Sequence, residues 1–402
     1  MMLGVASGSL AVLNTRRQRD DLGWARVPIR SAGLAQLGLG GEGCQVVRTL
    51  GASRANPAFM LLGADVGGVY RSLSGGAEWH PAMVGWHSRG AAGFAFDDAS
   101  PSHVLGLGGN SQSNSGANGL HVSFDGAASW SFVHPVADAH SCMDGSPLAF
   151  DPMSVRTSGE ASMTMTAYYS GSEGLWRSID AGKTWALVNP FLSTACLVVD
   201  RAGRLFASSS DDQSFGFYSC GTHYDGSTGN CSRVRPEYTT GLDLAGDRQT
   251  LFISNWQGVM VSHDHGTSFQ LLAGRGLPTS GTTPIHHVAV SPANASYISA
   301  WWAIGPYYNT SHAVSHDGGS SFQTVVFDNQ KAFMPWNGRD GKPVWHPTNA
   351  SVVWNAGGDW VTKSHDAGRT LAWSSNGYAV VPTPPNSSDD THVGQGRLRE
   401  WL

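Results

Sequence analysis

The stretch SIDAGKTW, Ser178–Trp185, recurs along the chain and decides how the sequence is organised. Further copies fit the pattern S-x-D-x-G-x-[ST]-[WF] with small deviations, and they begin at Ser72, Ser123, Ser262, Ser315 and Ser364. Successive starts lie 51, 55, 84, 53 and 49 residues apart. The interval of 84 leaves room for a unit that has lost the motif, and residues 204–220 (RLFASSSDDQSFGFYSC) fit such a unit. The spacing therefore predicts seven units of about 50 residues.

Each unit carries the pattern of four short strands. A β-rich run ends in a turn such as FAFDDASP (94–101), a second strand follows, a third begins near a glycine as in GLWRS (174–178), and the motif precedes a fourth. Glycine makes up 51 of 402 residues, tryptophan 15, and charged residues only 14%, which is typical of turn-rich β-structure. We therefore expect an all-β fold, a single seven-bladed β-propeller over residues 23–380. A leader at 1–22 and a tail at 381–402 would flank it, and residues 23–29 (GWARVPI) would close the ring against the last blade.

The motif has a structural role of its own. An aspartate at its third position can accept backbone N–H bonds across the hairpin between the third and fourth strands. The glycine adopts a conformation that other residues resist, and the closing aromatic residue packs between blades. We therefore expect the motif aspartates to be structural and not catalytic; they are Asp125, Asp180, Asp264, Asp317 and Asp366.

Charge and motifs exclude several functions. The formal net charge of −5 gives no basic footprint for nucleic acid, and the chain lacks an apolar run of 18 residues that could span a membrane. No metal site or cofactor is predicted, because H-E-x-x-H, paired C-x-x-C and nucleotide-binding loops are missing and His286 and His287 lie on opposite sides of a strand. Cys220 and Cys231 bracket a short polar loop that suits a disulfide, although five cysteines leave one unpaired.

Five N-x-[ST] sequons are present, at Asn230, Asn294, Asn309, Asn349 and Asn386. In a secreted protein these would be surface glycan sites, whereas a chain rich in serine and threonine also carries some by chance. We expect an extracellular protein, even though the N-terminal residues resemble a signal peptide poorly.

The repeated motif resembles the Asp-box (BNR) repeat of sialidases, sortilin-type receptors, photosystem II assembly factors and glycoside hydrolase family 74 (GH74) xyloglucanases. A second segment, ADVGGVYRS (64–72), is similar to the T-D-[VI]-G-G-x-Y-R segment in the first blade of GH74 enzymes, with Ala64 in place of threonine. This resemblance implies that Asp65 is the catalytic base. Gly67 and Gly68 would then let substrate approach the backbone closely. The alternative is that Asp65 caps its own turn.

GH74 enzymes place substrate between two propellers, and an aspartate of the second propeller is the general acid. The length of this chain predicts only one propeller, so the acid would be Asp359, with Asp138 as an alternative, or would come from a second propeller or partner chain. Asp359 holds the place in the last unit that Asp65 holds in the first, and a closed ring makes these blades neighbours. Six tryptophans outside the motif would stack on sugar rings or, alternatively, fill blade interfaces; they are Trp86, Trp256, Trp301, Trp302, Trp336 and Trp360.

These observations predict a carbohydrate-active protein, a glycoside hydrolase-like propeller acting on a β-glucan such as xyloglucan. The alternative is a non-catalytic propeller that binds a glycan or a protein, as sortilin-type propellers do. A sialidase fits less well, because VPIR (27–30) is not the expected Arg-Ile-Pro motif and Arg71 and Arg177 lie beside motifs, in structural positions.

Overall fold

A computed structural model of the chain describes residues 47–65, 67–109, 117–137, 139, 146–209, 215–227, 230–237, 239–278, 280–303, 310–327, 343–357 and 360–373. The regular structure of these residues consists of strands, apart from one 3-10 turn, η1 (Pro152–Ser154), and turns and loops connect the strands. The expected leader (1–22), closing segment (23–29) and tail (381–402) lie outside the described residues.

The strands form seven blades in chain order. The first blade contains β1 (Val47–Ala52), β2 (Met60–Ala64), β3 (Val69–Ser72) and β4 (His80–Pro81). The second contains β5 (Ala91–Phe96), β6 (Val104–Gly108), β7 (Gly119–Ser123) and β8 (Ser131–Pro135). The third contains β9 (Leu148–Phe150), β12 (Ala167–Gly171), β13 (Gly174–Ser178) and β14 (Ala186–Asn189). A hairpin of β10 (Val155–Ser158) and β11 (Ala161–Thr164) is inserted between β9 and β12.

The fourth blade contains β15 (Ala195–Val199), β16 (Arg204–Ser209), β17 (Gly216–Thr222) and β18 (Cys231–Arg235). The fifth contains β19 (Gly241–Leu244), β20 (Leu251–Asn255), β21 (Gly258–Ser262) and β22 (Gln270–Leu271). The sixth blade contains β23 (Ile285–Val290), β24 (Ile298–Ala303), β25 (Thr310–Ser315) and β26 (Gln323–Thr324). The seventh contains β28 (Val344–Trp345), β29 (Val353–Gly357), β30 (Trp360–Ser364) and β31 (Thr370–Trp373). A short strand, β27 (Val326–Phe327), pairs in parallel with the outer edge of β31.

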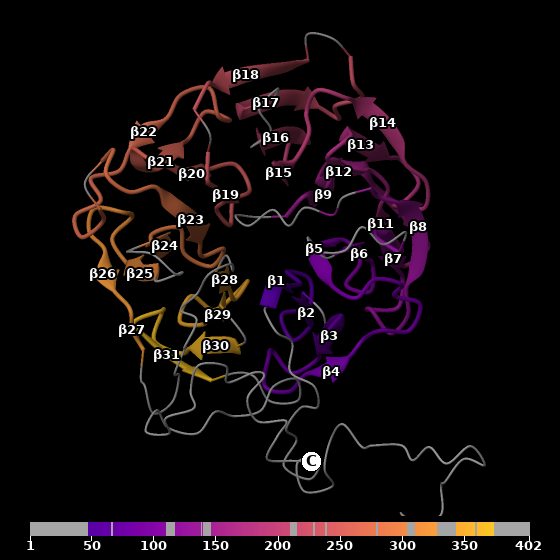
Figure 1. Cartoon of the computed structure of the whole chain (residues 1–402), viewed down its shortest axis with the longest axis horizontal. Helices are drawn as coiled ribbons and strands as arrows, with labels where there is room; N and C mark the ends of the chain where they lie inside the picture. The colour runs from indigo at the N-terminus through magenta and orange to yellow at the C-terminus, as the bar shows by residue number, and fades with distance from the viewer. Residues whose placement is uncertain are drawn as a thin grey trace, which may run out of the picture.

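The blades surround a central axis, with the first strand of each blade innermost (Figure 1). Strands that follow each other within a blade are antiparallel neighbours. This architecture confirms the prediction of an all-β, seven-bladed propeller, including a fourth blade that lacks the motif. Within the described part of the chain, residues of the first and seventh blades pack against each other and close the ring.

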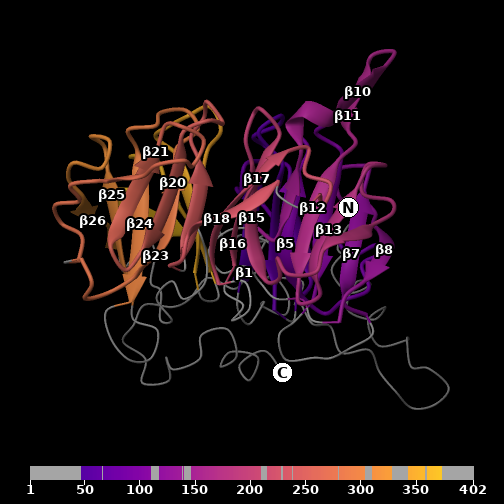
Figure 2. The ribbon, with the colours of Figure 1, turned by 90° about the horizontal axis from the view of Figure 1, so that it is seen from above.

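The two faces of the ring differ in their connections. The turns between first and second strands and between third and fourth strands lie on one face, which we call the motif face. The hairpin β10–β11 projects from this face (Figure 2). Connections between second and third strands, and between successive blades, lie on the opposite face, which we call the loop face. Asp65 therefore belongs to the loop face, as its position between β2 and β3 predicts.

Each third strand that carries a motif ends at the motif serine, and the aspartate organises the turn that follows. In the third blade, Asp180 Oδ1 accepts hydrogen bonds from Ser178 Oγ and from the Thr184 backbone, both at 2.9 Å, while Thr184 Oγ1 donates to Oδ2 at 2.6 Å. The Gly182 N–H donates to Ser178 Oγ at 2.9 Å. Ala181 and Gly182 both have positive φ, 63° and 81°, which explains the small residues at these positions. Both oxygen atoms of the Asp180 carboxylate thus accept hydrogen bonds from within the turn.

The fourth blade replaces the motif with a covalent link. Cys220 and Cys231 face each other on β17 and β18, and a disulfide joins them, as the sequence predicts. In the turn between the two strands, Asp225 accepts hydrogen bonds from the backbone and side chain of Ser227. The disulfide thus ties the third and fourth strands where the motif ties them in the other blades.

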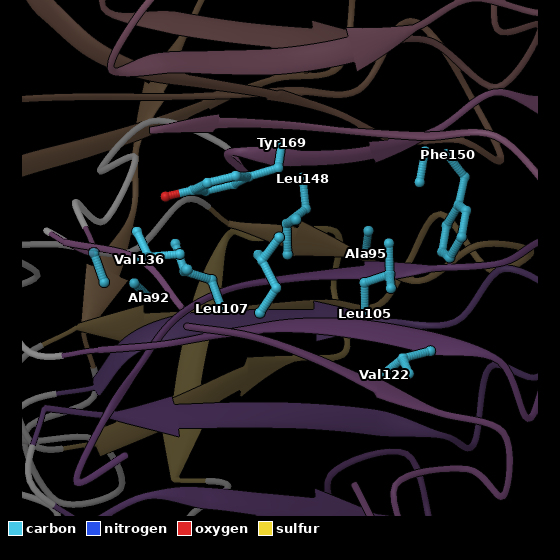
Figure 3. Packing of buried hydrophobic residues seen from close by; sticks show 12 residues of the cluster. Ala92, Ala95, Leu105, Leu107, Val122, Val136, Leu148, Phe150 and Tyr169 are labelled. Carbon is cyan, nitrogen blue, oxygen red and sulfur yellow. The ribbon is translucent and has the colours of Figure 1, made fainter. Parts of the chain in front are cut away.

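Apolar side chains fill the seams between blades. Figure 3 shows the seam between the second and third blades, where Leu105, Leu107 and Val122 face Leu148 and Phe150. Because neighbouring blades cover the second blade on both sides, its second and third strands are buried on both faces, whereas its fourth strand is partly exposed. Each fully buried leucine or phenylalanine contributes about 1.5–3 kcal/mol. Seam packing is therefore the main source of stability.

The ring closes through the same kind of seam. Trp354 of the seventh blade packs with Val47, Met60 and other residues of the first blade. Lys363 Nζ lies 5.1 Å from the centroid of the Trp354 ring and donates a hydrogen bond to the Gly75 carbonyl at 3.2 Å. The last blade is thus tied to the first motif turn by a cation.

Candidate functional site

Asp65 is the first residue of the loop that joins β2 to β3. The Ala64 N–H donates to the Gly68 carbonyl at 2.9 Å and closes this loop. The Asp65 residue is 8% exposed and lies at the seam with the second blade. A Cβ atom placed on Gly90 would come within 2.3 Å of the Asp65 carbonyl oxygen, so the backbones of the two blades touch here. The candidate base lies where the first and second blades meet.

Gly68 serves packing and not substrate access. Its φ is +77°, and a Cβ atom at this position would lie 2.2 Å from Met83 Sδ. The Val69 N–H also points at Met83 Sδ, at 3.0 Å. Gly68 is buried, whereas Gly67 beside it is half-buried. The expectation that substrate approaches the backbone at Gly68 is therefore corrected, because a methionine covers it.

The remaining catalytic candidates fall elsewhere. Asp359 and Asp138, the two candidates for the general acid, lie outside the described residues, as does Trp336. Trp360 begins β30, and its side chain is not among those described. Asp359 precedes Trp360 directly, between β29 and β30, which is the connection in the seventh blade that corresponds to the Asp65 loop in the first.

Three candidate tryptophans are buried, and this corrects the expectation that they offer surfaces to sugar. Trp86 is 6% exposed, Trp301 1% and Trp302 8%. Trp86 stacks on His121 at a centroid distance of 4.2 Å, and Trp301 stacks on His312 at 4.4 Å.

These two tryptophan–histidine stacks carry no positive charge at neutral pH. Burial lowers the pKa of His121 to about 4 and that of His312 to about 3. Trp302 belongs to the apolar seam between the fifth and sixth blades. All three indoles are packed against protein, as the alternative reading of interface filling expects.

Trp256 is different, because 54% of its surface is exposed. It lies at the tip of the hairpin between β20 and β21, on the loop face. The Gly281 N–H donates to the Trp256 carbonyl at 2.7 Å, and the Gln257 N–H donates to Asn255 Oδ1 at 2.8 Å. Arg235 of the fourth blade donates to Gln257 Oε1 at 3.0 Å. Three hydrogen bonds thus fix the turn that carries the exposed indole.

Two further features of the structure were not predicted from the sequence. Phe215 is 40% exposed and precedes β17, so it also belongs to a loop-face connection, and its position between second and third strands could have marked it. The second feature is a cavity of about 230 Å³ in the central channel, with lining residues from all seven blades that include Arg54 and Asp243. No motif marks these channel residues.

An ion pair crosses the channel on the motif face. Arg248, in the turn between β19 and β20 of the fifth blade, pairs with Asp98 in the turn between β5 and β6 of the second. These blades lie on opposite sides of the ring (Figure 1). Burial lowers the pKa of Arg248, and the Asp98 carboxylate opposes that change. This ion pair narrows the channel at its motif-face end.

The motif carboxylates are poor candidates for catalysis. Hydrogen bonds from the side chain and backbone of Ser321, and from Ser315, lower the pKa of Asp317 to about 2. Such an aspartate stays ionised and fully bonded at neutral pH. Among the described residues, no group of three or more histidine, cysteine, aspartate or glutamate side chains is placed to hold a metal ion. In the same part of the chain, no helix has the length and apolarity needed to cross a membrane.

Comparison with solved structures identifies the fold's relatives. Two are GH74 enzymes. The xyloglucanase of Xanthomonas campestris superposes with a TM-score of 0.67 at 18% identity, over 84% of this chain and 55% of the enzyme. The GH74 enzyme of Niastella koreensis gives 0.67 at 19% identity, with the same coverage. The chain thus spans about half the length of these enzymes.

A single-propeller protein is also similar. YCF48 from Cyanidioschyzon merolae gives a TM-score of 0.51 at 16% identity, over 80% of this chain and 96% of that one. At these identities the likeness shows the fold alone. No protein-family model and no curated protein matches the chain.

Proposed function

We propose that this chain is a carbohydrate-active propeller that engages a β-glucan such as xyloglucan on its loop face, with Asp65 as the general base of glycosidic hydrolysis. The observation that carries the proposal is the position of the ADVGGVYRS segment. It places Asp65 on the loop face, at the seam between the first two blades. GH74 enzymes are among the structures that share the fold.

The exposed indole of Trp256 supports a sugar ligand. Pyranose rings present C–H groups that pack on an aromatic face, and an aromatic side chain held rigidly pays little entropy on binding. Trp256 and Phe215 both belong to loop-face connections, in neighbouring blades. The ion pair between Arg248 and Asp98 crosses the opposite end of the channel. These features together favour the loop face as the side that meets the glycan.

Hydrolysis also needs a general acid. In an inverting mechanism the base removes a proton from water as the water attacks the anomeric carbon, while the acid protonates the departing oxygen across a carboxyl separation of about 6.5–9.5 Å. We propose Asp359 as the acid, because the seventh blade adjoins the first. A second propeller or partner chain is the other source, consistent with the 55% of the GH74 enzymes that this chain spans. An extracellular location suits a polysaccharide substrate.

A second candidate is a binding propeller without hydrolysis. The burial of Asp65, at 8% exposure, favours it, because a base that activates water needs access to that water. The ligand would be a glycan or a protein; one of the similar structures is YCF48 bound to D1 peptide. In this case Trp256 would still contribute to the contact surface.

The test is release of reducing sugar from a panel of β-glucans that includes xyloglucan. It compares the wild type with Asp65→Asn and with Glu173→Gln, which removes an exposed carboxylate from the same kind of loop in the third blade. We expect Asp65→Asn to lower kcat about 10²–10⁴-fold and Glu173→Gln to leave it unchanged. If no polymer is cleaved while glycan binding persists, the hydrolase proposal fails and the binding propeller stands.

A further inference from the structure

Two of the five sequons occupy equivalent turns on the motif face. Asn294 lies between β23 and β24 of the sixth blade, and Asn349 lies between β28 and β29 of the seventh. Both sequons read N-A-S, and both asparagines and both serines, Ser296 and Ser351, are exposed. This is the surface placement that an acceptor for an N-linked glycan needs.

The two turns use the asparagine in the same way. The Ser296 N–H donates to Asn294 Oδ1 at 3.0 Å, and the Ser351 N–H donates to Asn349 Oδ1 at 3.0 Å. In each turn the asparagine carbonyl also accepts a backbone hydrogen bond three residues on, at 2.9 Å and 3.0 Å. These bonds use only oxygen atoms of the asparagine side chain and backbone. They leave the amide nitrogen Nδ2, the atom that would be modified, directed away from the hydrogen bonds of the turn.

The first blade supplies an internal comparison. Its Asn56 occupies the same turn and accepts the Ala58 N–H at 3.3 Å, yet the sequence there is N-P-A. The turn therefore accommodates asparagine without a sequon, and in the second blade Ser100 takes the same position. What distinguishes the sixth and seventh blades is the serine two residues later, which the turn does not require, because its contribution to the turn comes from the backbone.

The disulfide is consistent with a secreted protein, and therefore with the compartment in which N-glycosylation takes place. Cys220 and Cys231 are joined, and Cys196 is also disulfide-bonded. Disulfides persist in the oxidising environment of secreted proteins, which is also where N-glycosylation takes place in eukaryotic cells.

From these observations we propose that Asn294 and Asn349 are N-glycosylation sites, which place two glycans on the motif face of neighbouring blades. The co-substrate is an oligosaccharide linked to a lipid pyrophosphate. The transfer forms a bond between asparagine Nδ2 and the anomeric carbon of the sugar, and it breaks the bond between that carbon and the phosphate oxygen. The lipid pyrophosphate leaves, and one amide proton passes to a base of the transferase. Both glycans would point away from the loop face and leave it open to ligand.

The experiment is peptide mapping by mass spectrometry of the full chain secreted from a eukaryotic host, before and after enzymatic deglycosylation. Ser296→Ala and Ser351→Ala are the informative variants, because each removes the sequon and retains the backbone N–H that supports the turn. We expect glycan on both asparagines in the wild type, the loss of one glycan in each variant, and an unmodified Asn56. Absence of glycan from either Asn294 or Asn349 in folded, secreted protein overturns the proposal. This outcome does not depend on the substrate of the loop face.

Discussion

Substitution of Asp97 should weaken the joint between the second and third blades. Asp97 is fully buried in the turn after β5. It accepts hydrogen bonds from the Ala99 N–H at 2.8 Å, from the Thr164 N–H at 2.7 Å and from Thr164 Oγ1, and it pairs with His103 Nδ1 at 2.8 Å. His103 Nε2 in turn contacts the Ala181 carbonyl of the third blade at 3.1 Å. One carboxylate thus holds two blades.

In Asp97→Asn, the amide NH2 group would face donors that now point at a carboxylate. Removing one partner of a buried charged network costs about 3–5 kcal/mol, and we expect this loss in the free energy of unfolding. Asp180→Asn is the matched comparison, since its carboxylate is only half-buried and caps a turn within one blade. We expect it to cost about 1 kcal/mol. Urea unfolding at pH 7, followed by tryptophan fluorescence, measures both.

The effect of Asp97 also has a pH signature. Burial alone raises the pKa of Asp97, but the hydrogen bonds from His103, Thr164 and Ala99 outweigh it and hold the pKa below its ordinary value. A depressed pKa in the folded state stabilises the protein fully above about pH 4, the pKa of an unfolded aspartate, and this stabilisation is lost as the pH falls through the folded pKa. The difference between wild type and Asp97→Asn should shrink over that range. A loss below about 1 kcal/mol at pH 7, or one equal to that of Asp180→Asn, would show that the Asp97 carboxylate does not join the two blades.

Three further predictions test the packing of the ring. Gly68→Ala should cost about 1–2 kcal/mol in urea unfolding because its φ is positive, and since the overlap is with the flexible end of Met83, Met83→Ala should restore little of the loss; full rescue would contradict this assignment of the cost to the backbone. The double variant Cys220→Ser/Cys231→Ser should lose about 3 kcal/mol in the free energy of unfolding, the cost of opening a loop of this length, and reducing agent should lower its Tm less than it lowers that of the wild type, because the disulfide of Cys196 still remains to be reduced; an equal drop would contradict the prediction. Lys363→Met should cost about 1 kcal/mol through loss of the contact with the first blade, and an unchanged Tm would show that the apolar seam closes the ring unaided.

The sequence predicts the fold because its signals are local and repeated. A hairpin with two residues at positive φ leaves the same short pattern in six blades, five of them with the aspartate and the first with Ser74 in its place, and the interval of 84 residues locates the seventh. The disulfide was predictable for the same reason, since Cys220 and Cys231 are close in the chain. The insertion of β10–β11 and the pairing of β27 with β31 left no comparable pattern.

The site was harder to predict, because burial in a propeller depends on the neighbouring blades. Trp301 and Trp302 follow each other on β24, so their side chains point to opposite faces of the blade. In a sheet with one solvated face, one of them would be exposed. Here both are buried, because another blade covers each face. Trp256 is exposed because it lies in a turn beyond the strands, and only knowledge of the strand ends separates it from the other two.

We propose that a β-glucan binds to the loop face, and electrophoresis of the native protein in gels that contain xyloglucan tests this binding. The decisive comparison is Trp256→Ala with Phe124→Ala, since Phe124 is an aromatic residue of the motif face with 38% exposure. We expect xyloglucan to retard the wild type and Phe124→Ala equally, and Trp256→Ala to weaken binding about tenfold or more. Retardation that is lost in Phe124→Ala and kept in Trp256→Ala, or no retardation of the wild type, would contradict the proposal.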